Sequence, residues 1–152
     1  KGAEDKKGKN IDAYDNAVFY NDFIIDSIFS LLANHSQLHP DMRISALYFS
    51  DHGENVYDEG DYCGHDYSGK IPHANVEIPF ILWCSESQNA FLQSEGAHLE
   101  QSLHTPYMID DLFHTILDLA SIKASCFDSR RSLVNKDYDA SRKRILEDGN
   151  YY

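Results

Sequence analysis

Apolar residues in the segment 11–34 recur at steps of three, four and seven, a spacing that predicts a long amphipathic helix with one apolar face. The residues of this face are Tyr14, Val18, Ile25, Ile28, Phe29 and Leu32. The helix should end near His39, because Pro40 lacks an N–H group and disfavours helical geometry in the residue before it. Residues 1–10 are rich in Lys and Gly and almost free of apolar side chains. We therefore expect them to be a flexible lead-in without regular structure.

Two short apolar runs, residues 44–49 and 76–84, lack the alternation of a strand with one solvated face. They predict strands that are covered on both faces, as in a parallel sheet. Pro79 lies near the start of the second run, where its missing N–H group does least harm. The segment between the runs, residues 55–75, is polar, rich in Tyr and interrupted by Gly. It predicts a long loop, and a loop of that length inside a compact domain usually carries function.

The C-terminal part of the chain predicts helices and weak edge strands. A faint helical pattern covers residues 88–103, and Thr105 followed by Pro106 is a helix-opening pair. The apolar face of that helix would consist of Ile109, Leu112, Phe113, Ile116, Leu117 and Ala120. Further on, residues 132–134 and 144–146 are candidate edge strands. The order of helix, strand, long loop, strand and helix predicts an α/β fold, a layered α/β/α sandwich with a mostly parallel sheet.

Composition and charge exclude several classes of function. Thirteen Lys and Arg against 25 Asp and Glu give a formal net charge of −12, so nucleic acid is not an expected partner. No apolar run reaches the roughly 18–20 residues needed to cross a bilayer. The three cysteines lie far apart and leave open one disulfide plus a free thiol, but argue against a zinc knot. Residue 1 is Lys instead of Met, which indicates a piece of a longer protein.

Candidate chemistry follows the first predicted strand. Ligands of open α/β sheets bind beyond the carboxyl ends of the strands, which is where Asp51 and His52 lie. A carboxylate and an imidazole are ligand types suited to zinc or a similar divalent ion. The alternative is that Asp51 caps a turn and His52 is a partly exposed loop residue. Three further side chains could converge on the same point: Glu54, His65 and His73.

Five segments in a fixed order resemble a known family. They are YDN at 14–16, YFSDHGE at 48–54, GH at 64–65, IPFILW at 78–83 and DDLFHT at 110–115. Together they are similar to the carboxyl-terminal half of the phosphoethanolamine transferases, which belong to the sulfatase and alkaline-phosphatase superfamily. The resemblance covers most of the chain from about Asp12 onward. It implies that residues 11–152 are the C-terminal portion of a sulfatase-like catalytic domain.

The resemblance also implies roles for particular residues. Asp51 and His52 match the motif residues that bind the catalytic zinc in the family. His65 matches a histidine that faces the phosphate group or a second metal, and His73 is its nearest rival for that role. Glu54 belongs to the motif, and we expect it to orient a ligand instead of binding metal.

The family's covalent nucleophile has no match in this sequence. It is a threonine that lies beside a metal-binding Glu, ahead of the matched region. Thr105 and Thr115 are the only threonines here, one at a helix start and one inside that helix, so neither fits. We therefore expect half of a split site without a catalytic residue, inactive in isolation and a weak binder of zinc. The membrane anchor and the N-terminal half of the catalytic domain would be absent.

The function implied by the resemblance is that of an enzyme of the bacterial inner membrane with this part in the periplasm. It would move phosphoethanolamine from phosphatidylethanolamine to lipid A or the lipopolysaccharide core, through a threonine-linked intermediate. Contact with the membrane would come only through the absent anchor. One alternative is a sulfatase or phosphatase that hydrolyses its ester with water. Another is a non-catalytic binding module, which predicts no metal at Asp51 and His52.

Overall fold

The structure is a computed structural model that describes residues 2–66, 69–97, 99–146 and 149. The chain forms two compact units, each described here by itself. The first consists of residues 1–39 and 46–83, and the second of residues 40–45 and 84–152. The metal-ligand candidates named above all belong to the first unit.

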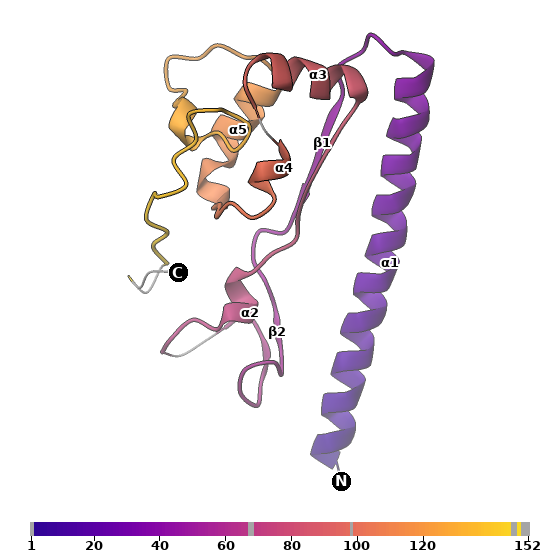
Figure 1. The fold of residues 1–152 in the computed structure, drawn as a ribbon. Coiled ribbons are helices and arrows are strands. Elements are labelled where there is room, and N and C mark those ends of the chain that lie inside the picture. The colour runs from indigo at the N-terminus through magenta and orange to yellow at the C-terminus, as the bar shows by residue number, and fades with distance from the viewer. Residues whose placement is uncertain (1, 67–68, 98, 147–148, 150–152) are drawn as a thin grey trace. The chain divides into compact units, whose positions relative to one another are not determined.

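Helix α1, Gly2–Leu38, is the longest element of the first unit (Figure 1). Its end at Leu38 confirms the prediction that Pro40 stops the helix near His39. The expectation that residues 1–10 lack regular structure is wrong for the described residues 2–10, which are helical. Side-chain contacts account for the difference, because Lys9 pairs with Asp5 one turn away at 2.7 Å. In addition, the Lys7 ammonium lies 4.7 Å from the centre of the Tyr57 ring.

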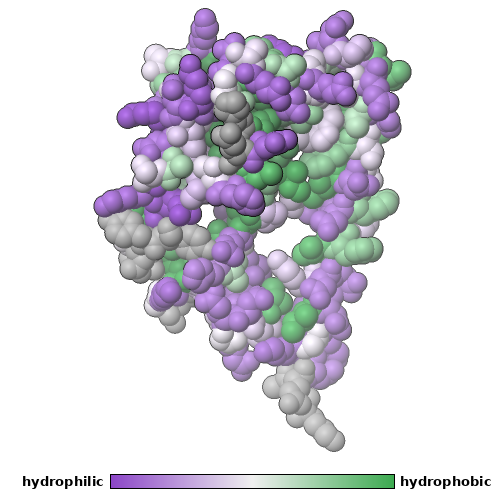
Figure 2. Space-filling model, viewed as in Figure 1, coloured by the Kyte–Doolittle hydropathy of each residue, from purple (hydrophilic) through white to green (hydrophobic). Residues whose placement is uncertain are grey.

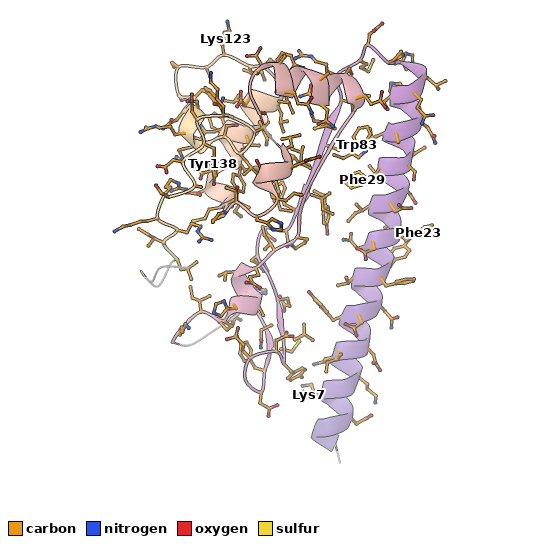
Figure 3. All side chains as sticks on the ribbon, viewed as in Figure 1. Lys7, Phe23, Phe29, Trp83, Lys123 and Tyr138 are labelled. Carbon is orange, nitrogen blue, oxygen red and sulfur yellow. The ribbon has the colours of Figure 1, made fainter. Side chains whose placement is uncertain are left out.

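The apolar residues of α1 are not confined to one face. Ile25, on the predicted face, is buried, whereas Tyr20, Phe23, Leu31 and Leu38 are largely exposed. Figure 3 shows Phe29 on the side of α1 toward Trp83 and Phe23 on the opposite side. Figure 2 shows apolar side chains at the surface among the polar ones. None of the described helices is both long enough and apolar enough to span a membrane.

Strands β1, Ser45–Phe49, and β4, Phe80–Cys84, pair with each other and confirm that the two apolar runs form strands. The expectation that both faces are covered is wrong, because no residue of either strand is buried and Ile81 is 41% exposed. Strand β4 begins later than its apolar run, since helix α2, His73–Val76, includes the first residue of the run and residues 77–79 have no regular structure. The predicted loop contains a second sheet, in which β2, Asn55–Val56, pairs antiparallel with β3, Cys63–Gly64. Its register places Asn55 opposite Gly64.

The helices of the second unit differ from the sequence expectation at their boundaries. The weak pattern at 88–103 becomes α3, Glu86–Ser94, and α4, Leu99–Ser102, while residue 98 lies outside the described residues. Between them Gly96 has a φ of +90°, a conformation that favours glycine and ends a helix. Helix α5, Leu112–Leu119, follows the 3₁₀ turn η1, Ile109–Asp111, so Thr105 and Pro106 do not open it.

The buried face of α5 is more polar than its pattern predicts. Phe113 and Ile116 are about half exposed, whereas His114 and Thr115 are buried. These two polar side chains accept hydrogen bonds from backbone N–H groups of the following segment. His114 Nδ1 accepts from Asp128 at 3.1 Å, and Thr115 Oγ1 accepts from Leu133 at 3.0 Å. Their burial is therefore compensated.

The two predicted edge strands are wrong. Residues 132–134 lie just after the 3₁₀ turn η2, Ser129–Arg131, and form a turn. The fully buried Ser132 donates its hydroxyl to Asp118 Oδ2 at 2.7 Å. The bond from Leu133 N–H to Thr115 occupies a donor that a strand would use in a sheet. In residues 144–146 only Ile145 makes an isolated bridge.

Candidate metal centre

Gly53, in the loop after β1, lets the backbone beside His52 approach α2 closely. Its N–H group donates to the carbonyl oxygen of Asn75 at 2.9 Å. A Cβ atom at this position would overlap the backbone oxygens of Ala74 and Glu77, closer than real Cβ atoms come. The glycine is therefore required by space, and it fixes where the loop carrying His52 lies.

The imidazole of His52 is held through its Nδ1 atom, which lies 2.9 Å from the carbonyl oxygen of Gly53. With Nδ1–H donating to this oxygen, Nε2 is left as the lone-pair nitrogen that a metal requires. The hydrogen bond to Gly53 raises the pKa of His52, and the charges of Asp51 and Glu54 act in the same direction. The surroundings of the ring are thus electronegative and favour a cation.

Asp51 lies close to the same nitrogen. Its Oδ1 atom is 3.9 Å from His52 Nε2, and its side chain is 85% exposed. Two ligand atoms bound to one tetrahedral zinc ion at about 2.0–2.2 Å each lie about 3.3–3.6 Å apart. The observed distance is a few tenths of an ångström longer, so a small rotation of the exposed Asp51 side chain would be needed for both to bind one ion, and the assignment of this pair stays a prediction.

Within the described residues, three side chains lie close enough together that they could hold a metal ion: His52, Glu54 and His65. Each offers one ligand atom, and these atoms lie within 4.8 Å of one another. The rings of the two histidines have centres 4.4 Å apart, and His65 Nδ1 lies 3.0 Å from Glu54 Oε2. Neither Asp51 nor His73 belongs to this group, and the role of His65 stays a prediction.

The β2–β3 pairing brings Glu54 and His65 together across eleven positions of sequence. Glu54 directly precedes β2 and His65 directly follows β3, so the register places them side by side. The fully buried Asn55 stabilises the segment between β2 and β3, because its amide donates to the carbonyl oxygens of Glu59 at 3.1 Å and Tyr62 at 2.8 Å. Sequence reasoning missed this hairpin, although Gly60 in Asp-Glu-Gly-Asp is a turn signal.

Thr115 does not have the surroundings of a nucleophile. Thr115 is fully buried, and its hydroxyl bonds the Tyr107 hydroxyl at 2.9 Å and the Leu133 N–H group. The Thr115 hydroxyl is thus committed to contacts within the second unit, to which Thr105 also belongs.

The donor set of the group fits zinc. Imidazole nitrogens and carboxylate oxygens are ligand types typical of catalytic zinc sites, and the described loop offers both. Each imidazole has its Nδ1 beside an oxygen acceptor, Gly53 O for His52 and Glu54 Oε2 for His65. Such outer contacts fix the tautomer and ring orientation of metal-binding histidines.

The raised pKa of His52 gives a pH prediction. A proton competes with zinc for Nε2, so zinc affinity should fall as the pH drops through the pKa of His52. Because that pKa is raised, the fall should begin at a higher pH than for an ordinary histidine. Zinc dissociation constants measured across pH 5.5–8 with a competing chelator test this. An affinity independent of pH over this range would contradict a role for His52 as ligand.

Comparisons with known proteins agree with this picture of the fold. The sulfatase family model matches residues 1–122. The chain is 33% identical over 140 residues to the phosphoethanolamine transferase EptC of Escherichia coli K12. This alignment covers 91% of the chain but 22% of EptC, so the chain spans about a fifth of the length of that relative.

Two solved structures extend the likeness to three dimensions. The C-terminal periplasmic domain of EptC from Escherichia coli superposes with a TM-score of 0.69 at 32% identity, over 90% of this chain and 36% of that domain. A structure of the same domain in complex with zinc gives a TM-score of 0.67, also at 32% identity, over 83% and 33%. The resemblance to phosphoethanolamine transferases and the α/β class are thereby confirmed, and the chain belongs to the sulfatase family.

Proposed function

We propose that this chain is the C-terminal part of the catalytic domain of a phosphoethanolamine transferase and supplies half of its metal centre. The observation that carries the proposal is the convergence of His52, Glu54 and His65 after β1, in a fold shared with a zinc-bound periplasmic domain. The remainder of the domain and a membrane anchor would come from an N-terminal portion of the same protein. This part would then lie in the periplasm of a bacterium.

His52 is the central ligand of the proposed centre. It lies 3.9 Å from Asp51 on one side, and its ring centre is 4.4 Å from that of His65 on the other. We assign zinc to His52 and Asp51, with His65 facing the phosphate group or a second ion. Glu54 acts by holding Nδ1 of His65 at 3.0 Å, which fixes the orientation of the ring.

The proposed reaction moves phosphoethanolamine from phosphatidylethanolamine to lipid A or the lipopolysaccharide core. Zinc, when bound, neutralises charge on the phosphoryl group and lowers the pKa of the attacking hydroxyl. The residues of this chain bind and orient, while the threonine nucleophile comes from the N-terminal portion. The hydrolase alternative has less support, since the similar proteins reported above are transferases.

The isolated 152-residue chain should show no transfer or hydrolysis of phosphoethanolamine esters above background, because it lacks the nucleophile.

In a longer protein that carries this segment, His52→Ala and Asp51→Ala should each abolish transfer to lipid A, measured as the mass increase of the product. His104→Ala, which alters an exposed histidine of the second unit, should leave transfer unchanged. Turnover by the isolated chain that disappears with Asp51→Ala would show that the nucleophile has been misplaced.

A further inference from the structure

One buried residue, Asn75 in α2, is bonded to the backbone beside both histidines of the metal centre. Its carbonyl oxygen accepts from the N–H group of Gly53, the residue after His52, at 2.9 Å. Its side-chain Nδ2 donates to the carbonyl oxygen of His65 at 3.1 Å. Asn75 is only 6% exposed, so neither bond competes freely with water.

The segment that carries Asn75 is itself fixed. The Glu59 carboxylate accepts from the N–H groups of His73 at 2.5 Å and Ala74 at 3.3 Å, which anchors the start of α2. The N–H group of Asn75 donates to Pro72 at 3.1 Å. The close approach of Gly53 to Ala74 leaves no room for α2 to shift toward the loop. Asn75 is therefore a fixed point to which the two histidine-bearing segments are attached.

The side-chain bond requires an amide in one orientation. A flipped amide would place Oδ1 against the carbonyl oxygen of His65, acceptor facing acceptor. An aspartate at this position would likewise place a carboxylate oxygen against the carbonyl oxygen of His65. The N–H donor at Nδ2 is thus the feature that distinguishes Asn from residues of equal size.

We propose that Asn75 is the positioning residue of the metal centre. It sets the separation of His52 and His65 without touching the ion, so that both rings face one point before metal arrives. The proposal rests on the proposed function only in taking these two histidines as metal-binding side chains. A preset separation reduces the ordering that zinc binding would otherwise require.

The test compares Asn75→Asp with Asn21→Asp in the 152-residue chain. Asn21 lies in the same unit and donates to the Tyr48 hydroxyl at 2.5 Å, so the control makes the same chemical change away from the centre. In metal-free protein, an NMR cross-peak between the His52 and His65 rings should be present in the wild type and in the control, and lost in Asn75→Asp. Zinc affinity should fall about 10- to 100-fold in Asn75→Asp alone. The added negative charge would by itself favour zinc, so it cannot produce this loss.

Asn75→Gln, which keeps the amide donor on a longer side chain, should recover part of the affinity. A ring cross-peak and zinc affinity of wild-type size in Asn75→Asp would overturn the proposal. If Asn75→Asp does not fold, Asn75→Leu removes the donor from a side chain of similar size without an added charge. Failure of the proposed function gives a different result, because zinc binding by the wild type would then be unaffected by His52→Ala. The ring cross-peak would still decide the role of Asn75.

Discussion

Gly53→Ala should eliminate zinc binding by the 152-residue chain and lower its stability. The new Cβ atom would overlap two backbone oxygens of α2, those of Ala74 and Glu77, which cannot move aside as a flexible side chain does. Overpacking of this kind costs about 1–3 kcal/mol in the free energy of unfolding. Relief of the overlap would separate the His52 loop from α2 and break the bond from Gly53 to Asn75. Urea unfolding and zinc titration measure the two effects.

The matched control is Gly8→Ala, in α1. A Cβ atom at Gly8 meets nothing within 4 Å, and the residue is helical. Alanine there should raise the free energy of unfolding by about 0.5–1 kcal/mol and leave zinc binding unchanged. If Gly53→Ala kept both the stability and the zinc affinity of the wild type, the close approach of this loop to α2 would be incorrect.

Asp111→Asn should give the largest loss of stability in the second unit, about 3 kcal/mol. The Asp111 side chain is 3% exposed and pairs with Nε of Arg131 and with Nη2 of Arg142, the latter at 3.0 Å. Both arginines also reach Asp110, at 3.2 Å and 2.6 Å. Without the Asp111 carboxylate, two guanidinium groups would share the single charge of Asp110. We take the lower end of the usual cost because the arginine side chains are a third exposed.

The control for this prediction is Asp128→Asn. Asp128 pairs with Arg130 at 2.9 Å, but the guanidinium is mostly exposed, so the substitution should change stability little. Thermal unfolding followed by circular dichroism compares the two variants. Equal effects of Asp111→Asn and Asp128→Asn would mean that the network around Asp111 does not hold η1, η2 and the segment near Arg142 together.

Local chemistry determined the parts of the fold that were predicted correctly. Pro40 ended α1 near the expected position because its effect on the preceding residue needs no tertiary contact. The apolar run at 44–49 gave β1, and the position of Asp51 and His52 just after it followed directly. The helical state of residues 2–10 was missed, since it involves the contact of Lys7 with the distant Tyr57.

The assembly of the centre depends on contacts that no local pattern reveals. The pairing of Glu54 with His65 needs the β2–β3 register. The buried amide of Asn55 stabilises the segment that connects these two strands. Likewise, spacing in the sequence does not show that His65 lies near His52 and Glu54 while His73 is outside their group. The polar face of α5 was missed because the buried Thr115 hydroxyl is satisfied by Tyr107 and Leu133, and the apolar pattern of the helix does not show these hydrogen bonds.

Two ligand arrangements share His52, and this makes it the decisive residue. One pairs it with Asp51 at 3.9 Å, and the other groups it with Glu54 and His65. The isolated chain offers a few donors on an exposed loop, so we expect weak binding of a single zinc ion. The net charge of −12 also attracts divalent ions loosely at other places, so weak binding alone decides nothing.

Calorimetric titration of the 152-residue chain with zinc, beside its His52→Ala and His104→Ala variants, tests the metal centre most directly. We expect a weak one-to-one isotherm for the wild type and for His104→Ala, and its loss in His52→Ala. An isotherm unchanged by His52→Ala would contradict the centre, because zinc would then bind elsewhere.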